Sequence, residues 1–173
     1  MKIEESGMIF NADDQDSKVY HIEKSKLYEK IIDGVKVCEF LLLDGDKCKI
    51  IEAKKSAPNP NNKEDGNEKN YEVFIDDINA KFINSFSMFI ANKIKRHNIE
   101  KYDEMSELFK KSKLSKLDFS FILIIKGSQT EWLSPVSDSL KNKMRGFIRS
   151  WNINDINIKV LNEELARQKN LIQ

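Results

Sequence analysis

Long apolar runs are missing from this chain of 173 residues, and their absence argues against a membrane-spanning protein. No stretch approaches the roughly 20 apolar residues that a membrane helix needs. The first ten residues, MKIEESGMIF, place Glu4 and Glu5 where the apolar part of a signal peptide would begin. We therefore expect a cytoplasmic protein with no membrane partner.

Cysteine and histidine are scarce, with two residues of each kind. Cys38 and Cys48 are too few for a disulfide scaffold, and neither has Cys or His neighbours at the spacing of a zinc site. We expect both to be small core residues. His21 and His97 stand apart in the sequence and lack the partners of a catalytic triad, so we assign them no role.

A large net charge is also missing, because 29 Lys and Arg residues face 28 Asp and Glu residues, for a formal net charge of +1. A surface that binds nucleic acid would therefore be a local patch. Hydrophobic residues make up 40% of the chain and charged residues 33%, which is typical of a folded protein and not of a disordered one. The length predicts one domain over residues 1–173 with a sizeable core.

Patterns typical of strands and of helices alternate along the chain, which predicts an α/β protein. The first 17 residues are expected to be irregular or a short edge strand, and residues 98–117 a connection with a solvent-exposed helix. The segment at 118–126 is apolar on both faces, which indicates a central strand in a covered sheet. Strands are expected at residues 18–23, 35–43, 48–54, 118–126 and 157–161, and helices at 26–32, 71–96, from 134 onward, and 162–169.

A long polar segment separates the predicted strand at 48–54 from the helix that follows. Residues 55–70 are rich in proline, asparagine and charge, which predicts a flexible exposed loop. Residues 71–96 then place apolar side chains on one helical face, which predicts a helix packed on the core. The residues of this face are Ile75, Ile78, Phe82, Phe86, Phe89 and Ile90.

The helix after residue 134 has an apolar side and a basic side. Ser134 and Pro135 form a typical helix start, with Ser as the cap and Pro at the first position. On the basic side, Lys141, Arg145 and Arg149 recur every four residues and could contact phosphates of a nucleic acid, although a plain solvated face fits the same pattern. The apolar stripe consists of Val136, Leu140, Met144, Phe147 and Trp151.

The most informative segment is the hairpin predicted over Val35–Lys54, which turns at Asp44-Gly45-Asp46. Because side chains alternate along a strand, Glu52 and Lys54 share one face of the returning strand. If Gly45 and Asp46 are central in the turn, position 39 pairs with 52; if Asp44 and Gly45 are central, 39 pairs with 50 and lies diagonal to 52. Both registers place Glu39 and Glu52 on the same side, at most roughly 8 Å apart.

Two adjacent carboxylates among apolar neighbours are costly to bury unless they are paired or bind a cation. Hard ions such as Mg²⁺ or Mn²⁺ take oxygen ligands, commonly one or two carboxylates with water and phosphate. Lys54 projects to the same side and could stabilise charge on an attacked phosphate or position the attacking water. The simpler alternative is a Glu–Lys surface pair at the end of a strand.

The run CEFLLLDGDKCKIIEAK resembles the core hairpin of the PD-(D/E)XK nucleases, the restriction-endonuclease-like superfamily. Glu52-Ala53-Lys54 matches the (D/E)-x-K element, and Glu39 stands where the first acidic residue, usually Asp, belongs. The proline of the pattern is absent. Many members carry a further Glu upstream, for which Glu23 is the first candidate and Glu29 the second. In similar bacterial members Ser and Pro follow the E-x-K element, which would place Lys55 and Ser56 at the mouth of the site.

This resemblance implies a restriction-endonuclease-like fold, in which helices flank a mixed β-sheet core. It also implies a Mg²⁺- or Mn²⁺-dependent endonuclease that hydrolyses phosphodiester bonds of DNA, in bacterial defence or a mobile element. The implied roles are metal ligands for Glu39 and Glu52, electrostatic catalyst for Lys54, and auxiliary ligand or water positioner for Glu23. The alternative is a catalytically inactive module that binds nucleic acid, a partner protein or a second copy of itself.

Overall fold

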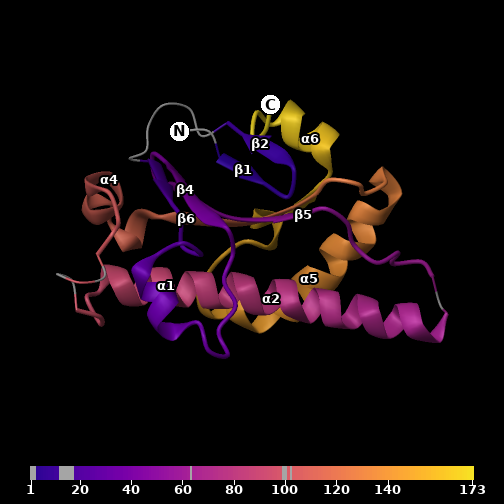
Figure 1. The fold of residues 1–173 in the computed structure, drawn as a ribbon, viewed down its shortest axis with the longest axis horizontal. Helices are drawn as coiled ribbons and strands as arrows, with labels where there is room; N and C mark the ends of the chain where they lie inside the picture. Colours follow the sequence, from indigo (N-terminus) through magenta and orange to yellow (C-terminus); the bar gives the residue numbers. More distant parts are fainter. Residues whose placement is uncertain (1–2, 12–17, 63, 99–100, 102) are drawn as a thin grey trace.

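A five-stranded mixed β-sheet forms the centre of the computed structural model, which describes residues 3–11, 18–62, 64–98, 101 and 103–173 (Figure 1). The strand order is β3-β4-β5-β6-β7, with antiparallel pairing from β3 to β5 and parallel pairing from β5 to β7. The strands are β3 (Val19–Tyr20), β4 (Phe40–Asp44), β5 (Lys47–Lys54), β6 (Asp118–Ile125) and β7 (Ile158–Leu161). The predicted α/β class with a mixed sheet flanked by helices is therefore confirmed.

Different elements cover the two faces of the sheet. Figure 1 shows the long helices α2 (Asp65–Lys93) and α5 (Thr130–Ser150) on one side, and α6 (Glu163–Gln168) with a small hairpin on the other. This hairpin consists of β1 (Ile3–Glu5) and β2 (Met8–Phe10). The shorter helices are α1 (Lys26–Ile31), α4 (Glu107–Lys111), and the 3-10 turns η2 (Leu114–Lys116) and η3 (Asp155–Asn157). None of these described helices is both long and apolar enough to cross a membrane.

Alternation along the strands divides the core into two layers. On the side of α2 and α5, the strands contribute Leu41, Cys48 and Ile50 to one cluster, which phenylalanines fill. On the other side, residues such as Ile51 and Ala53 pack against the β1–β2 hairpin and α6. Both cysteines are free and buried, as predicted.

The β4–β5 hairpin has the first of the two registers considered from the sequence. Asp44 pairs with Lys47 and Phe40 with Ile51, so Gly45 and Asp46 are the central turn residues. Gly45 has a φ of 60° at the first central position, where a two-residue hairpin turn favours glycine. The first strand is shorter than predicted, because residues 35–39 do not join it. The Cys38 N–H instead donates to the Ser85 Oγ of α2, at 2.7 Å.

The predicted loop at 55–70 is wrong in its second half, because α2 begins at Asp65. The Asn67 side chain donates to the carbonyls of Asn59 (2.7 Å) and Asn62 (2.9 Å), which ties the preceding turn to the first turn of the helix. Part of this polar run is therefore helical, and local side-chain contacts that its composition does not reveal support the helix start.

Other boundaries also differ from expectation. α5 begins at Thr130, with Pro135 inside the helix, because the buried Leu133 anchors an additional first turn. The strand expected at 18–23 shrinks to β3. The helix expected to be solvent-exposed within 98–117 buries Phe109, whose ring lies 6.0 Å from that of Phe89.

Phe86 is the aromatic centre of the larger core layer, and its loss should destabilise the protein strongly. Its ring lies 4.8 Å from that of Phe119 and 5.1 Å from that of Phe147. We expect Phe86→Ala to lower the free energy of unfolding by about 3–5 kcal/mol, measured by urea denaturation. Val73→Ala, on the exposed side of the same helix, should change it by less than about 0.5 kcal/mol. Equal effects would contradict this description of the core.

Candidate active site

Glu52 is a fully buried acidic residue near the carboxyl end of β5, with 0% exposure. The strand lies between β4 and β6, so main-chain pairing holds it on both sides. Its side chain points to the same face as Cys48 and Ile50, the face that α2 covers. A carboxylate in such a place needs polar partners, because an unpaired buried charge loses its hydration, at a cost of roughly several kcal/mol.

Two lysines bind one oxygen of Glu52. Its Oε1 accepts from the Nζ of Lys81, at 2.7 Å, and lies 2.9 Å from the Nζ of Lys54. Burial raises the pKa of Glu52, and the two lysines only partly offset this rise. Burial also acts to lower the pKa of Lys81, but the Glu52 charge and hydrogen bond raise it overall. The ammonium group of Lys81 therefore stays protonated and holds the carboxylate in place.

The second oxygen of Glu52 has no such partner. Oε2 is buried and makes no hydrogen bond in the structure. A buried acceptor without a partner is expensive, at about 1–3 kcal/mol and more for a charged group. A hard cation at this atom would remove the penalty, since carboxylate oxygens are the ligands that Mg²⁺ and Mn²⁺ prefer. The unpaired Oε2 therefore fits the expected ion.

Glu39 comes immediately before β4 and lies close enough to Glu52 for their charges to interact. Its N–H donates to the carbonyl of Ile51, the residue before Glu52, at 3.2 Å, although the strand pairing itself begins only at Phe40. Burial, a hydrogen bond with Glu23 and the charge of Glu52, in that order, raise the pKa of Glu39 to about 8. The structure thus brings Glu23, Glu39 and Glu52 into electrostatic contact, and these three residues are called the carboxylate cluster. Within the described part of the chain, however, no three acidic, His or Cys side chains are grouped as a ready-made metal site.

Lys81 is the site residue that the sequence analysis missed. It lies on α2 one turn before Ser85, which accepts from the backbone of Cys38, next to Glu39. Both side chains interrupt the apolar face of the helix, and Lys81 keeps only 11% of its side chain exposed. The polar Lys81 and Ser85 beside the apolar Ile78 and Phe82 were the sequence signal for a buried polar contact. Spacing alone does not show which carboxylate a buried lysine binds.

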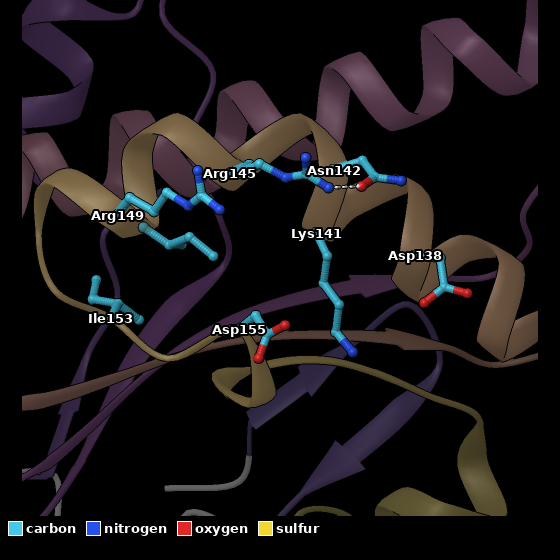
Figure 2. A pocket seen from close by; sticks show the side chains of 8 residues that line it. Asp138, Lys141, Asn142, Arg145, Arg149, Ile153 and Asp155 are labelled. Atoms are coloured by element: carbon cyan, nitrogen blue, oxygen red, sulfur yellow. Dashed lines mark hydrogen bonds between the residues drawn. The ribbon is translucent and has the colours of Figure 1, made fainter.

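The remaining predicted residues lie around or away from this cluster. Lys55 and Ser56 are exposed directly after Lys54, at the end of β5. Glu29 is exposed on α1. The basic residues of α5, which are Lys141, Arg145 and Arg149, line a separate hollow (Figure 2).

The raised pKa of Glu39 predicts how stability depends on pH in the protein without a bound cation. In the unfolded chain Glu39 titrates near 4.5, whereas in the folded protein it titrates near 8. The folded state therefore binds more protons than the unfolded state in this interval. The stabilisation that protonated Glu39 contributes is complete below pH 4.5 and is lost as the pH rises to about 8. We expect Glu39→Gln to flatten the fall in unfolding free energy between about pH 5 and 8, measured in EDTA. A variant that keeps the wild-type slope would contradict this.

The contact between Lys81 and Glu52 can be measured with a double-mutant cycle. We expect Lys81→Met to destabilise the protein, since it leaves a buried carboxylate with one cation fewer. In combination with Glu52→Gln the loss should be smaller than the sum, with a coupling energy of about 1–3 kcal/mol in urea unfolding. Additive effects would show that the two side chains do not interact.

Comparisons of this chain with protein-family models, with curated proteins and with solved structures gave no match. The site is therefore characterised by its own chemistry. It contains a buried carboxylate with one oxygen held by two lysines and the other oxygen unpaired, beside two further carboxyl groups.

Proposed function

We propose that this protein is a metal-dependent nuclease of the PD-(D/E)XK type, which hydrolyses phosphodiester bonds of DNA. The observation that carries the proposal is the buried Glu52, with Oε1 bound by Lys54 and Lys81 and Oε2 left without a partner. Support comes from the contact of Glu39 with β5, because its N–H donates to the carbonyl of Ile51, the residue before Glu52. The mixed sheet flanked by helices is compatible with a restriction-endonuclease-like fold.

Glu39 and Glu52 are the residues that would hold Mg²⁺ or Mn²⁺. Both offer carboxylate oxygens, and two carboxylates with water and phosphate oxygens are a common set for Mg²⁺. A bound ion of this kind supplies an acidified water and neutralises charge on the attacked phosphate. Glu23, which is only partly buried and hydrogen-bonds to Glu39, would orient that water or accept its proton.

The two lysines have different positions and so different proposed roles. Lys81 is nearly buried and fixes the Glu52 carboxylate from the side of α2. Lys54 has 30% of its side chain exposed at the end of β5, where it can leave Glu52 and contact a phosphate. Lys55 and Ser56 follow at the exposed strand end and would contact the nucleic-acid backbone. Lys54 is therefore the proposed electrostatic catalyst and Lys81 a positioning residue.

A second candidate is a catalytically inactive nuclease-fold module. The observation that favours it is Glu39 in the position where Asp is usual, because the longer side chain moves its carboxyl group outward by one methylene. Such a module would keep the carboxylate cluster for structure and bind nucleic acid or a partner protein without cleaving it.

Cleavage of plasmid and single-stranded DNA with Mg²⁺, Mn²⁺ or EDTA tests the proposal. We expect wild-type cleavage that EDTA abolishes and that Glu52→Gln reduces below detection. Lys54→Ala should slow it by about 10²–10³-fold, the usual effect of losing one group that stabilises transition-state charge.

Glu29→Gln is the matched control for charge removal, because Glu29 is exposed on α1 outside the cluster. It should cleave like the wild type. Calorimetric binding of Mn²⁺ to the wild type, lost in Glu52→Gln, gives a readout besides cleavage. Cleavage that persists in both site variants would overturn the site, and absence of any cleavage by a wild type that binds Mn²⁺ would favour the inactive module.

A further inference from the structure

A second charged feature lies on α5, away from the carboxylates. Lys141, Arg145 and Arg149 follow one another at every fourth position, about 6 Å apart along the helix axis. With Ile153 and η3 they line a hollow of about 760 Å³ (Figure 2). Their spacing presents a row of cationic groups along one side of the helix.

The three cations are not used for ion pairs among the described residues. Arg145 donates to the Oδ1 of Asn142 at 2.8 Å, which leaves its other donors available. Figure 2 shows the Lys141 side chain extending toward Asp155, with Asp138 on the same side of the hollow, whereas Arg145 and Arg149 lie along the helix away from both acids. Three cations and two acids thus line this hollow, which leaves it a formal charge of +1, and Arg145 and Arg149 are available to an anion.

An exposed aromatic ring follows directly after these arginines. Trp151 caps the carboxyl end of α5 and is 50% exposed. Its ring packs on Phe86, with centroids 4.6 Å apart and planes at 68°, so the indole is held rather than free to rotate. It also lines a neighbouring apolar hollow of about 560 Å³ with residues such as Ile94 and Leu114. Ile153 lines both hollows, so the two hollows meet at the carboxyl end of α5, with the arginines on one side of the helix and Trp151 on the other.

We propose that this α5 surface, with Arg145 and Arg149 on one side of the helix and Trp151 on the other, binds a single-stranded nucleic acid that crosses the carboxyl end of α5. The guanidinium groups would contact successive phosphates, for which arginine has matching donor geometry. An unpaired base would stack on Trp151, as bases do on exposed aromatic side chains in single-strand-binding proteins. A duplex offers no free base face to this ring, so the aromatic group selects the single strand.

This surface is distinct from the carboxylate cluster. β5 and β6 are parallel, with Glu52 opposite Leu123 and Lys47 opposite Asp118. Asp118 accepts from the Asn157 side chain of η3, which borders the α5 surface. The strand from Asp118 to Leu123 spans about 17 Å, so the α5 surface and the carboxylate cluster lie toward opposite ends of the parallel strands. Binding here goes beyond the proposed hydrolysis and does not depend on it.

Fluorescence anisotropy of a labelled oligothymidylate in EDTA measures this binding without cleavage. We expect the single strand to bind more tightly than a duplex of equal length, and Trp151→Leu to weaken binding about tenfold. Arg145→Ala and Arg149→Ala should each weaken it and reduce the salt slope by about 0.7. Quenching of Trp151 fluorescence in a Trp132→Phe background reports the stacking itself, and Trp151→Phe, which keeps a ring, should bind better than Trp151→Leu.

Matched controls separate this surface from general charge and from the carboxylate site. Lys169→Ala removes an exposed cation next to α6, on the other side of the sheet, and should bind like the wild type. Glu52→Gln should also bind normally, even if it cleaves nothing, so failure of the nuclease proposal leaves this one intact. Equal binding of duplex, no effect of Trp151→Leu, loss of binding in Glu52→Gln, or tighter binding of an acidic amphipathic peptide would each overturn the proposal.

Discussion

The attachment of α2 to the carboxyl end of β5 through Lys81 and Glu52 is the interaction on which the site depends. It joins a helix and a central strand through a 2.7 Å contact between groups that are almost fully buried. Without the lysines, Glu52 would be an unpaired charge inside the larger core layer. With them, the protein keeps a charged group in its interior and leaves one of its oxygens available.

Local pattern was enough to predict the hairpin, its turn and the proximity of Glu52 and Lys54. Alternation predicted Glu39 and Glu52 on one side in either register; the structure has the register with Gly45 and Asp46 central in the turn, and Glu39 lies just before the paired strand. The length of β4 was not predictable in the same way, because Ser85 of α2 takes the Cys38 N–H that a longer strand would have used.

Tertiary contacts decide the features that the sequence analysis missed. Lys81 is 29 residues from Glu52, and helical spacing places it beside the apolar face without naming its partner. Asn67 makes the start of α2 helical by bonding to the preceding turn, where polar composition predicted a loop. The Lys81 contact joins segments that are far apart in the sequence, whereas the Asn67 contacts lie within one segment whose composition did not indicate a helix start.

The two polar side chains of α2 that reach the hairpin also determine when the site can form. Ser85 holds the backbone next to Glu39, and one helical turn away Lys81 holds Glu52. A chain with a finished hairpin and an undocked α2 would contain neighbouring carboxylates without their buried cation. Assembly of the site therefore requires the docking of this one helix, and a chain in which α2 is undocked carries the residues of the site but not its geometry.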